Sequence, residues 1–185
     1  RYTDKDQNFY FYGGIKIWQQ KQTLLAETFY LYKDSGKFLG SGGVTTVFPY
    51  ESKKDQEEKR IEIESDELSY KPEKNTVAYR GNCILHVRDI QMQAHVLSVL
   101  LDEKNGTVTG ISAEGEVKVL QSKSEGRGQE AFFNVDEETF ILEGNPELID
   151  QNSGKIEGDK LTFHIADGKI TVENKGRERS ISVIK

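Results

Sequence analysis

The feature that most constrains the fold of this sequence is a repeat of about thirty residues with two recurring markers. One marker is a glycine that opens a run of alternating apolar residues, with copies at Gly14, Gly43, Gly81, Gly115 and Gly144, spaced 29 to 38 residues apart. The other is a small residue, usually followed by an acid, before a second alternating run, with clear copies at Ala26, Ser65 and Gly158. A unit this short cannot bury its apolar edge alone, so neighbouring copies are expected to stack around a shared interior.

Each copy predicts short antiparallel strands, because apolar and polar residues alternate at period two and turn residues separate the runs. Asn105-Gly106 and Asp167-Gly168 indicate tight turns, since Asn, Asp and Gly tolerate the positive φ that such turns need. The phase of alternation changes after Ala94, which predicts a bulge or bend near residues 94–96. With 54 Val, Ile, Thr, Phe and Tyr residues against 6 Ala, the sequence predicts an all-β protein.

The length of 185 residues predicts one domain spanning residues 1–185. Residues 51–60 carry eight charges and no apolar side chain, and we interpret them as a long charged loop or linker inside the repeat array, with a domain boundary as the alternative. The chain opens at Arg1 without a leader, so we expect a processed or trimmed product. No apolar run approaches the roughly 20 residues of a transmembrane helix.

Charge and cysteine content exclude several functions. The net charge of −6 disfavours a surface that follows nucleic-acid phosphates. Cys83 is the only cysteine, so an intramolecular disulfide and a cysteine-based zinc site are excluded, and burial as a small apolar residue is expected. The strand phase places His86 and His164 on polar faces and His95 on the inner face with Leu97. No two histidines have ligand spacing, so neither a metal nor a cofactor is predicted.

Motifs of catalysis are equally weak. The carboxylates fall mostly in turns and on polar strand faces, and the glycine-rich residues 40–43 and 126–128 do not lead from a strand into a helix as a phosphate loop must. No serine-nucleophile elbow occurs, so a non-enzymatic protein is predicted. Aromatic residues gather near the start: Phe9, Tyr10, Phe11, Tyr12, Trp18, Phe29, Tyr30, Tyr32, Phe38, Phe48 and Tyr50. We expect them to cap one end of the interior, the alternative being a platform for sugar rings or bases.

The order of the repeat motifs is distinctive. It begins with Ser65-Asp66-x-Leu68-x-Tyr70, continues through Gly81-Asn82-Cys83 and Gly115-Glu116-Val117, and extends into residues 140–146 and 156–163 and back into residues 26–43. This pattern resembles the OstA-like family of lipopolysaccharide-transport proteins, which includes LptA and the jelly-roll domains of LptC and LptD. The sequence departs from the family pattern at Ser65 and Gly158, where Ala is preferred, at His95, which replaces an acid, and in the charged residues 51–60.

The resemblance implies an elongated, twisted β-jelly roll of stacked antiparallel strands, open along one side, that holds the acyl chains of lipopolysaccharide. It implies a periplasmic carrier or bridge between the inner and outer membranes. Such domains join through terminal edge strands, so LptC-like and LptD-like proteins, or further copies of the chain, are the expected partners. The candidate edges are residues 9–18 at the start and residues 169–172 or 180–184 at the end.

Residues with inward phase at strand centres are the candidates for the acyl-chain groove. They are Leu68, Tyr70, Leu85, Val87, Met92, Val99, Val117, Val119, Phe140, Leu142, Leu161, Phe163 and Ile165. Each also fits an ordinary packed core, because periodicity identifies the inner face without distinguishing a dry core from a lipid-lined groove. Lys118, Lys160 and Arg88 are candidates to meet head-group phosphates at the groove rim. The alternative function is a polysaccharide-binding or polysaccharide-cleaving β-repeat domain, with the early aromatics as sugar platforms and turn carboxylates as catalysts.

Overall fold

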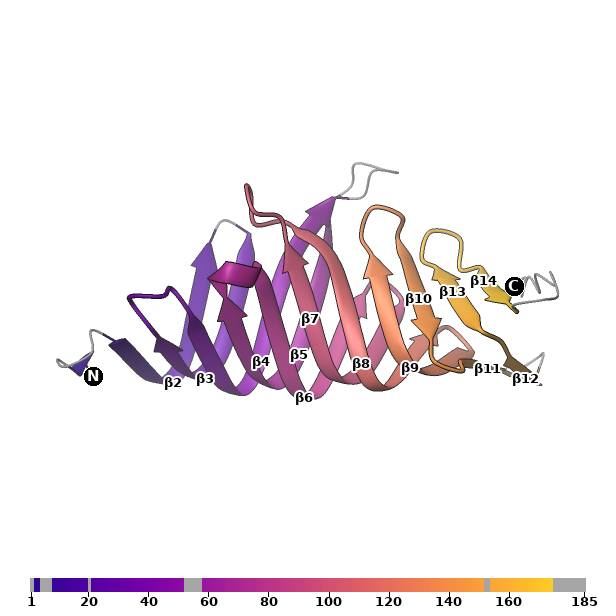
Figure 1. The fold of residues 1–185 in the computed structure, drawn as a ribbon, viewed down its shortest axis with the longest axis horizontal. Coiled ribbons are helices and arrows are strands. Elements are labelled where there is room, and N and C mark those ends of the chain that lie inside the picture. Colours follow the sequence, from indigo (N-terminus) through magenta and orange to yellow (C-terminus); the bar gives the residue numbers. More distant parts are fainter. Residues whose placement is uncertain (1, 4–7, 20, 52–57, 152–153, 175–185) are drawn as a thin grey trace.

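The computed structural model describes residues 2–3, 8–19, 21–51, 58–151 and 154–174. These residues form one elongated antiparallel sheet that folds over on itself, with the N- and C-terminal parts at opposite ends (Figure 1). The only helix among them is a 3-10 turn, η1 (Pro72–Lys74), so the predicted all-β class is confirmed. No helix in these ranges is long and apolar enough to span a membrane.

The strands follow one another in the sheet almost in chain order. They are β1 (Tyr2–Thr3), β2 (Asn8–Gln19), β3 (Gln22–Leu31), β4 (Phe38–Glu51), β5 (Glu58–Lys71), β6 (Thr76–Val87), β7 (Ile90–Leu101), β8 (Val108–Gln121), β9 (Ser124–Asn134), β10 (Thr139–Glu143), β11 (Glu147–Asp150), β12 (Gly154–Glu157), β13 (Lys160–His164) and β14 (Ile170–Glu173). Beyond β9 the sheet divides, because β10 continues to β13 and β14 whereas β11 pairs with both β9 and β12.

Bends near the middle of the long strands divide the sheet into two walls. The pairing register shifts at residues 12–15, 41–44, 80–83 and 114–117 of β2, β4, β6 and β8. We call residues 15–19, 21–25, 44–51, 58–64, 83–94, 117–128, 147–151 and 154–157 the first wall. Residues 8–12, 28–41, 67–80, 96–114, 130–143 and 160–173 form the second wall. The two walls pack across a shared interior, which is how stacked repeats bury their apolar faces.

The two sequence markers meet at these bends. Gly81 has φ +75° and is followed by Asn82 at φ 47°, and the Asn82 amide donates a hydrogen bond to Asp66 Oδ2 at 2.9 Å. A Cβ atom on Gly81 would lie 2.3 Å from that same oxygen, so only glycine fits. One bend later, Gly115 has the same close approach to His95. The recurring glycine and the recurring small-acid pair are therefore the two sides of one corner of the roll.

The corner also corrects the placement of His95. The predicted bulge is confirmed, because the pairing register shifts between Gln93 and Val96. His95 lies within that bulge, with its side chain 66% exposed and Nε2 3.6 Å from Glu116 Oε2, so its predicted inner-face position is wrong. The alternation of inner and outer faces in β7 shifts by one residue at the bulge, so the alternation that includes Leu97 begins only after His95. Extending this alternation back to His95 therefore assigns it to the wrong face.

The structure also describes Cys83 and part of the charged residues 51–60. Cys83 is buried with a free thiol, as expected, and burial raises the pKa of that thiol to about 11. The charged segment is shorter than predicted, since Glu51 ends β4 and residues 58–60 begin β5, while residues 52–57 lie outside the described residues. Lys59 belongs to β5, where it pairs with Tyr50 of β4, and its ammonium has a buried carboxylate partner that local composition does not reveal. The single domain over residues 1–185 stays a prediction.

Candidate functional site: the cavity between the walls

The aromatic residues at the N-terminal end divide by face. Because side chains alternate along a strand and Phe11 pairs with the buried Phe29, the phenylalanines of the Phe-Tyr-Phe-Tyr run in β2 lie on the inner face and the tyrosines on the outer face. The inward set continues across the second wall: ring centres lie 6.4 Å apart for Phe11 and Phe29, 5.1 Å for Phe29 and Phe38, and 5.0 Å for Phe38 and Tyr70. The early aromatics are therefore two separate layers, of which one faces the interior.

A cavity of about 300 Å³ lies between the walls beside this inward layer. Leu24 and Phe48 line it from the first wall, and Phe38, Tyr70 and Leu101 from the second. Trp18 also lines it and is 69% exposed, so the cavity reaches the surface at the N-terminal end of the roll. A concave, mainly apolar space of this kind accepts apolar chains, because their burial removes apolar surface from water.

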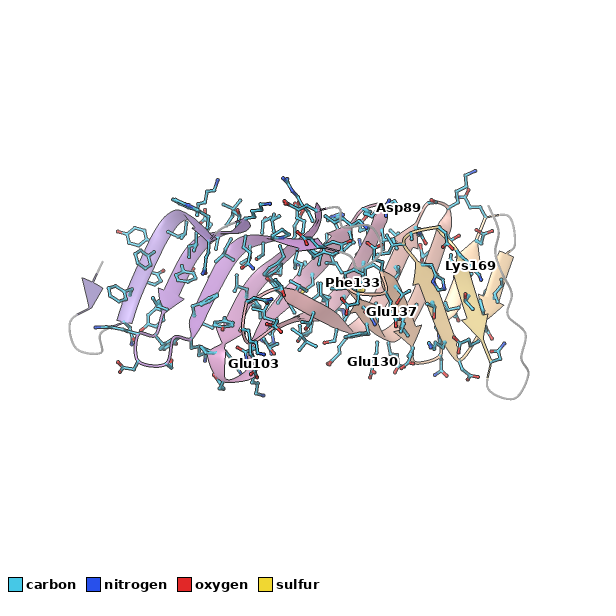
Figure 2. The ribbon with its side chains drawn as sticks, turned by 90° about the horizontal axis from the view of Figure 1, so that it is seen from above. Asp89, Glu103, Glu130, Phe133, Glu137 and Lys169 are labelled. Atoms are coloured by element: carbon cyan, nitrogen blue, oxygen red, sulfur yellow. The ribbon has the colours of Figure 1, made fainter. Side chains whose placement is uncertain are left out.

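Beyond the cavity the interior is packed. Lys59 on the first wall forms an ion pair of 2.6 Å with Glu138, which lies in the turn between β9 and β10 on the second wall, and both side chains are buried. Tyr50 donates a hydrogen bond to Glu138 Oε1 at 3.4 Å, and its ring meets that of Phe133 edge-on, with centres 6.2 Å apart. Figure 2 shows Phe133 within the roll and Glu130, from the same strand, at its edge. These contacts join the two walls where their free edges meet.

The predicted groove residues all face the interior, but they do not all line the cavity. Leu68 and Tyr70 line it. The other eleven candidates are buried in the packed interior: Leu85, Val87, Met92, Val99, Val117, Val119, Phe140, Leu142, Leu161, Phe163 and Ile165. Their contact with acyl chains stays a prediction.

Sequence reasoning missed most of the cavity lining. Leu24 and Leu101 have inward phase at strand ends, and the buried Thr46 and Phe48 alternate with only partly buried residues in β4, so period-two alternation contained the signal. They lie outside the strand centres after residue 60 from which the groove candidates come. Lys59, which closes the packed part, carried no local signal at all.

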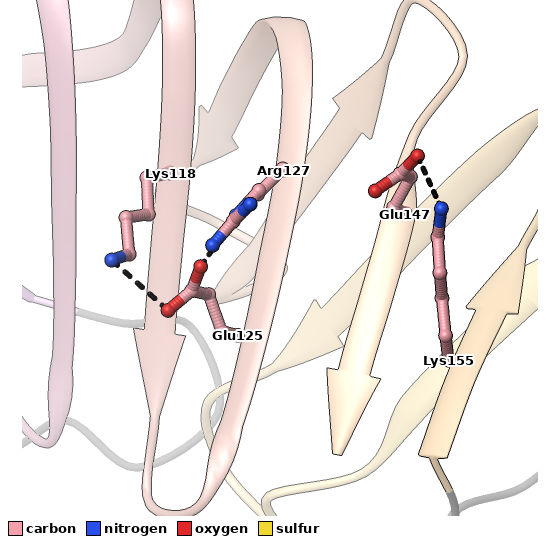
Figure 3. A network of polar contacts seen from close by, with 5 residues as sticks. All are labelled: Lys118, Glu125, Arg127, Glu147 and Lys155. Atoms are coloured by element: carbon pink, nitrogen blue, oxygen red, sulfur yellow. Dashed lines mark hydrogen bonds and ion pairs between the residues drawn. The ribbon is translucent and has the colours of Figure 1, made fainter.

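The proposed phosphate-binding cations have partners of their own. Lys118 Nζ lies 3.0 Å from Glu125 Oε2, and Arg127 binds the other oxygen of the same carboxylate (Figure 3). Burial alone would raise the pKa of Glu125, but the hydrogen bonds from Lys118 and Arg127 outweigh it, so the pKa is lowered. Lys160 Nζ lies 3.5 Å from Glu173. Phosphate binding by these two lysines stays a prediction, and would have to compete with the carboxylates.

Arg88, the third candidate for phosphate binding, lies away from the cavity. Arg88 has φ +53° in the exposed turn between β6 and β7, at the end of the first wall rather than at the cavity. Within the described ranges, no three His, Cys, Asp or Glu side chains come together as a metal site would require.

Comparison with known proteins decides the family. The family profile described as "LptA/(LptD N-terminal domain) LPS transport protein" matches residues 62–169, more than half of the chain. The chain belongs to this family of lipopolysaccharide transport proteins. The OstA-like family predicted from the repeat motifs is thereby confirmed. No curated protein matches the chain.

Solved structures agree on the fold. The crystal structure of LptH, the LptA homologous periplasmic component of the conserved lipopolysaccharide transport device from Pseudomonas aeruginosa, superposes with a TM-score of 0.54 at 16% identity. The match covers 68% of this chain and 94% of LptH. At this identity it shows the fold alone, and the twisted β-jelly roll that was predicted is confirmed.

The LptA/LptD N-terminal family match also divides the molecule. It begins in β5 and ends just before β14, so it covers the packed interior. The strands β2 to β4, which carry Leu24, Phe38 and Phe48 of the cavity, precede it. The cavity is therefore lined partly by strands that precede the matched residues and partly by matched residues such as Leu68 and Tyr70.

Proposed function

We propose that this protein is a periplasmic lipopolysaccharide carrier that holds acyl chains between the two walls of the roll, and that it acts as a bridge between membranes rather than as an enzyme. Membership of a lipopolysaccharide transport family supports the cargo, and the periplasmic assignment follows the description of LptH. The observation that carries the acyl-chain site is the mainly apolar cavity of about 300 Å³ at the N-terminal end.

The position of the cavity implies where chains enter. Trp18 and Ile17 line its exposed side, whereas Leu68 and Tyr79 line its inner side, next to the packed interior. Chains enter at the N-terminal end and advance toward β5 and β6. Further advance along the roll requires the walls to separate, because Lys59 and Glu138 hold them together beyond the cavity.

A pair of neighbouring leucines tests the site. A photo-crosslinking residue at Leu24, which lines the cavity, is expected to label intact lipopolysaccharide and not its deacylated form. The same residue at Leu25 is the matched control, because Leu25 is 40% exposed on the opposite face of the strand. Equal labelling from both positions, or equal labelling by the deacylated form, would contradict acyl binding in the cavity.

Probes deeper in the roll test how far chains travel. Val87, Phe140 and Phe163 are buried in the packed interior, so labelling from these positions requires the walls to separate. We expect labelling there to be weaker than at Leu24 in the isolated protein. Labelling at Phe163 without labelling at Leu24 would place entry at the C-terminal end and reject the proposed direction.

Edge pairing is the second part of the proposal. β1 pairs with Asn8 and Phe9 of β2, and among the described residues no strand pairs with the outer edge of β2 from Phe11 onward. At the other end, β14 is the last strand of its path, while residues 180–184 lie outside the described residues. Unpaired backbone N–H and C=O groups at these two edges suit antiparallel or parallel addition of another strand. LptC-like and LptD-like proteins, and further copies of the chain, are the proposed partners.

Solution assembly tests the pairing. Light scattering is expected to show a mass that rises with protein concentration, accompanied by slower amide exchange in β2. A monomer at all concentrations, with unchanged exchange in β2, would reject self-pairing. Pairing with the LptC-like and LptD-like partners is tested by the same exchange measurement on the mixed proteins.

A further inference from the structure

We infer that the outer face of the second wall carries a separate binding site for an anionic saccharide, one that bears phosphate or carboxylate groups. It is a surface cavity of about 630 Å³, lined mainly by outward residues of β2 to β6, by Tyr32 and Lys37 between β3 and β4, and by the buried Leu68. Most of its lining lies on the opposite side of the sheet from the cavity between the walls, and only Leu68 lines both cavities.

One row of residues, paired across five strands, lines the cavity, with tyrosines at one end and small residues at the other. Tyr10 pairs with Tyr30, Tyr30 with Leu39, Leu39 with Ser69, and Ser69 with Ala78. Side-chain size therefore falls along the row from β2 to β6. The two tyrosines stand at one end, and the short side chains leave a hollow beside them.

Tyr32 extends the aromatic wall. Its ring centre lies 4.6 Å from that of Tyr30 in an edge-on arrangement, and the Tyr10 and Tyr30 centres are 6.2 Å apart. Tyr30 and Tyr32 are only partly buried, so ring surface faces the hollow. A rigid ring edge or face next to open space suits the C–H face of a sugar, which combines apolar and polar groups as tyrosine does.

Hydroxyl groups line the floor. Thr28 Oγ1 and Ser41 Oγ lie 2.6 Å apart and share a hydrogen bond, and the neighbouring Ser69 also lines the cavity. Hydroxyls both donate and accept, so this floor can bind the hydroxyls of a saccharide without a fixed polarity. A purely apolar ligand would leave these groups without water, which argues for a polar ligand here.

Charge selects the anion. Lys37, Lys71 and Arg80 line the cavity against one carboxylate, Glu67, although the whole chain has a net charge of −6. Lys37 Nζ lies 5.4 Å from the centre of the Tyr32 ring, which links the basic and aromatic groups. Arg80 pairs in register with Glu67, yet no ion pair between them occurs in the described structure. Its guanidinium is thus available to a phosphate or carboxylate, which it binds in bidentate geometry.

The test uses a saccharide without acyl chains. The probe is the phosphorylated oligosaccharide obtained by deacylating lipopolysaccharide, compared with its dephosphorylated form by calorimetry or ligand-observed NMR. The double variant K71Q/R80Q is expected to bind the phosphorylated probe about tenfold more weakly than the unchanged protein, since two charge-assisted contacts are removed. Tyr30→Val is expected to weaken both forms of the probe.

K74Q is the matched control, because Lys74 is an exposed cation in η1 that does not line the cavity. Its affinity is expected to be unchanged, and the thermal unfolding of K71Q/R80Q is expected to match that of the unchanged protein. Absence of probe binding at millimolar concentration, or equal affinity of K71Q/R80Q and the unchanged protein, overturns the inference.

Competition separates two sources of the same chemistry. Displacement of the oligosaccharide by intact lipopolysaccharide would show that the cavity holds the head group of the cargo. Persistence of oligosaccharide binding under saturating lipopolysaccharide would show that a separate anionic saccharide uses the site. Both results support the site, whereas failure of acyl crosslinking at Leu24 would reject the carrier proposal and leave this inference standing.

Discussion

The N-terminal strands and the central strands of the roll are built from the same repeat but differ in how they are packed. β2 has no buried residue among its described positions, and Trp18 and Tyr12 are more than 60% exposed. In β6 and β8 every inward residue of the central stretches is buried, including Leu85 and Val119 at 0% exposure. The corner geometry is shared, since both regions bend at glycines with positive φ.

The difference shows that bent strands alone do not produce a filled interior. A corner brings two halves of a strand to face each other, but the space between them is filled only where opposing side chains are large and the free edges are joined. The central region has stacked Phe133 and Phe140, 4.5 Å apart, and the Lys59–Glu138 ion pair. The N-terminal region lacks a buried ion pair in its described residues and retains a cavity.

The largest expected effect contrasts two phenylalanines. Phe163→Ala is expected to lower the free energy of unfolding by about 3–5 kcal/mol, because the side chain is fully buried. Phe11→Ala, at 44% exposure, is expected to cost about 1 kcal/mol or less. Urea unfolding of both variants measures the contrast, and similar losses would show that the N-terminal strands are as tightly packed as the filled interior around Phe163.

The junction between the walls is the next test. Lys59→Met removes the buried partner of Glu138 and is expected to destabilise the protein by about 3 kcal/mol, since the carboxylate keeps only the longer Tyr50 contact. The double variant K59M/E138L is expected to recover most of that loss, because no buried charge remains. Glu58→Gln is the control, as it breaks the exposed Lys21–Glu58 pair and is expected to cost below about 0.5 kcal/mol.

K59M also bears on transport. If the ion pair limits how far acyl chains advance, the K59M/E138L variant is expected to show more labelling at Phe163 than the unchanged protein, with labelling at Leu24 unaffected. Unchanged labelling at Phe163 would mean that packing, rather than the ion pair, holds the walls together.

The sequence could predict those features of the two regions that depend on residues close together in the chain, but not those that depend on residues far apart. Corners were readable because a glycine and a small-residue pair recur along the chain and mark them locally, and the inward phase of residues such as Leu85 followed from period-two alternation. The phase failed at His95, where a bulge adds one residue. The Lys59–Glu138 pair joins residues 79 positions apart and has no local signature, so the buried lysine looked like part of a charged loop. The cavity was hidden for the same reason, since it depends on which walls meet.

The corners themselves give a smaller, paired prediction. Gly81→Ala is expected to cost about 2–3 kcal/mol, because φ +75° is unfavourable for alanine and its Cβ would meet Asp66. Gly13→Ala has a comparable φ of +92° but no atom within 4 Å of the added Cβ, so about 1 kcal/mol is expected. Equal costs in thermal or urea unfolding would mean that backbone conformation alone, and not the packed corner, fixes the glycine.

The smallest expected effect concerns surface charge on the packed region. It tests whether interior packing or surface electrostatics causes the difference between the central and the N-terminal strands. The pKa of Glu125 is lowered in the folded protein by Lys118 and Arg127, so the ionised carboxylate stabilises the fold above the ordinary glutamate pKa of about 4.3, and this contribution is lost as pH falls through the lowered value. Glu125→Gln is therefore expected to cost below about 1 kcal/mol near pH 7, with the difference from the unchanged protein vanishing on acidification and shrinking in 1 M salt. Urea unfolding across this pH range measures it. A loss as large as that of Phe163→Ala would mean that the surface network, rather than the filled interior, distinguishes the central strands from the N-terminal ones.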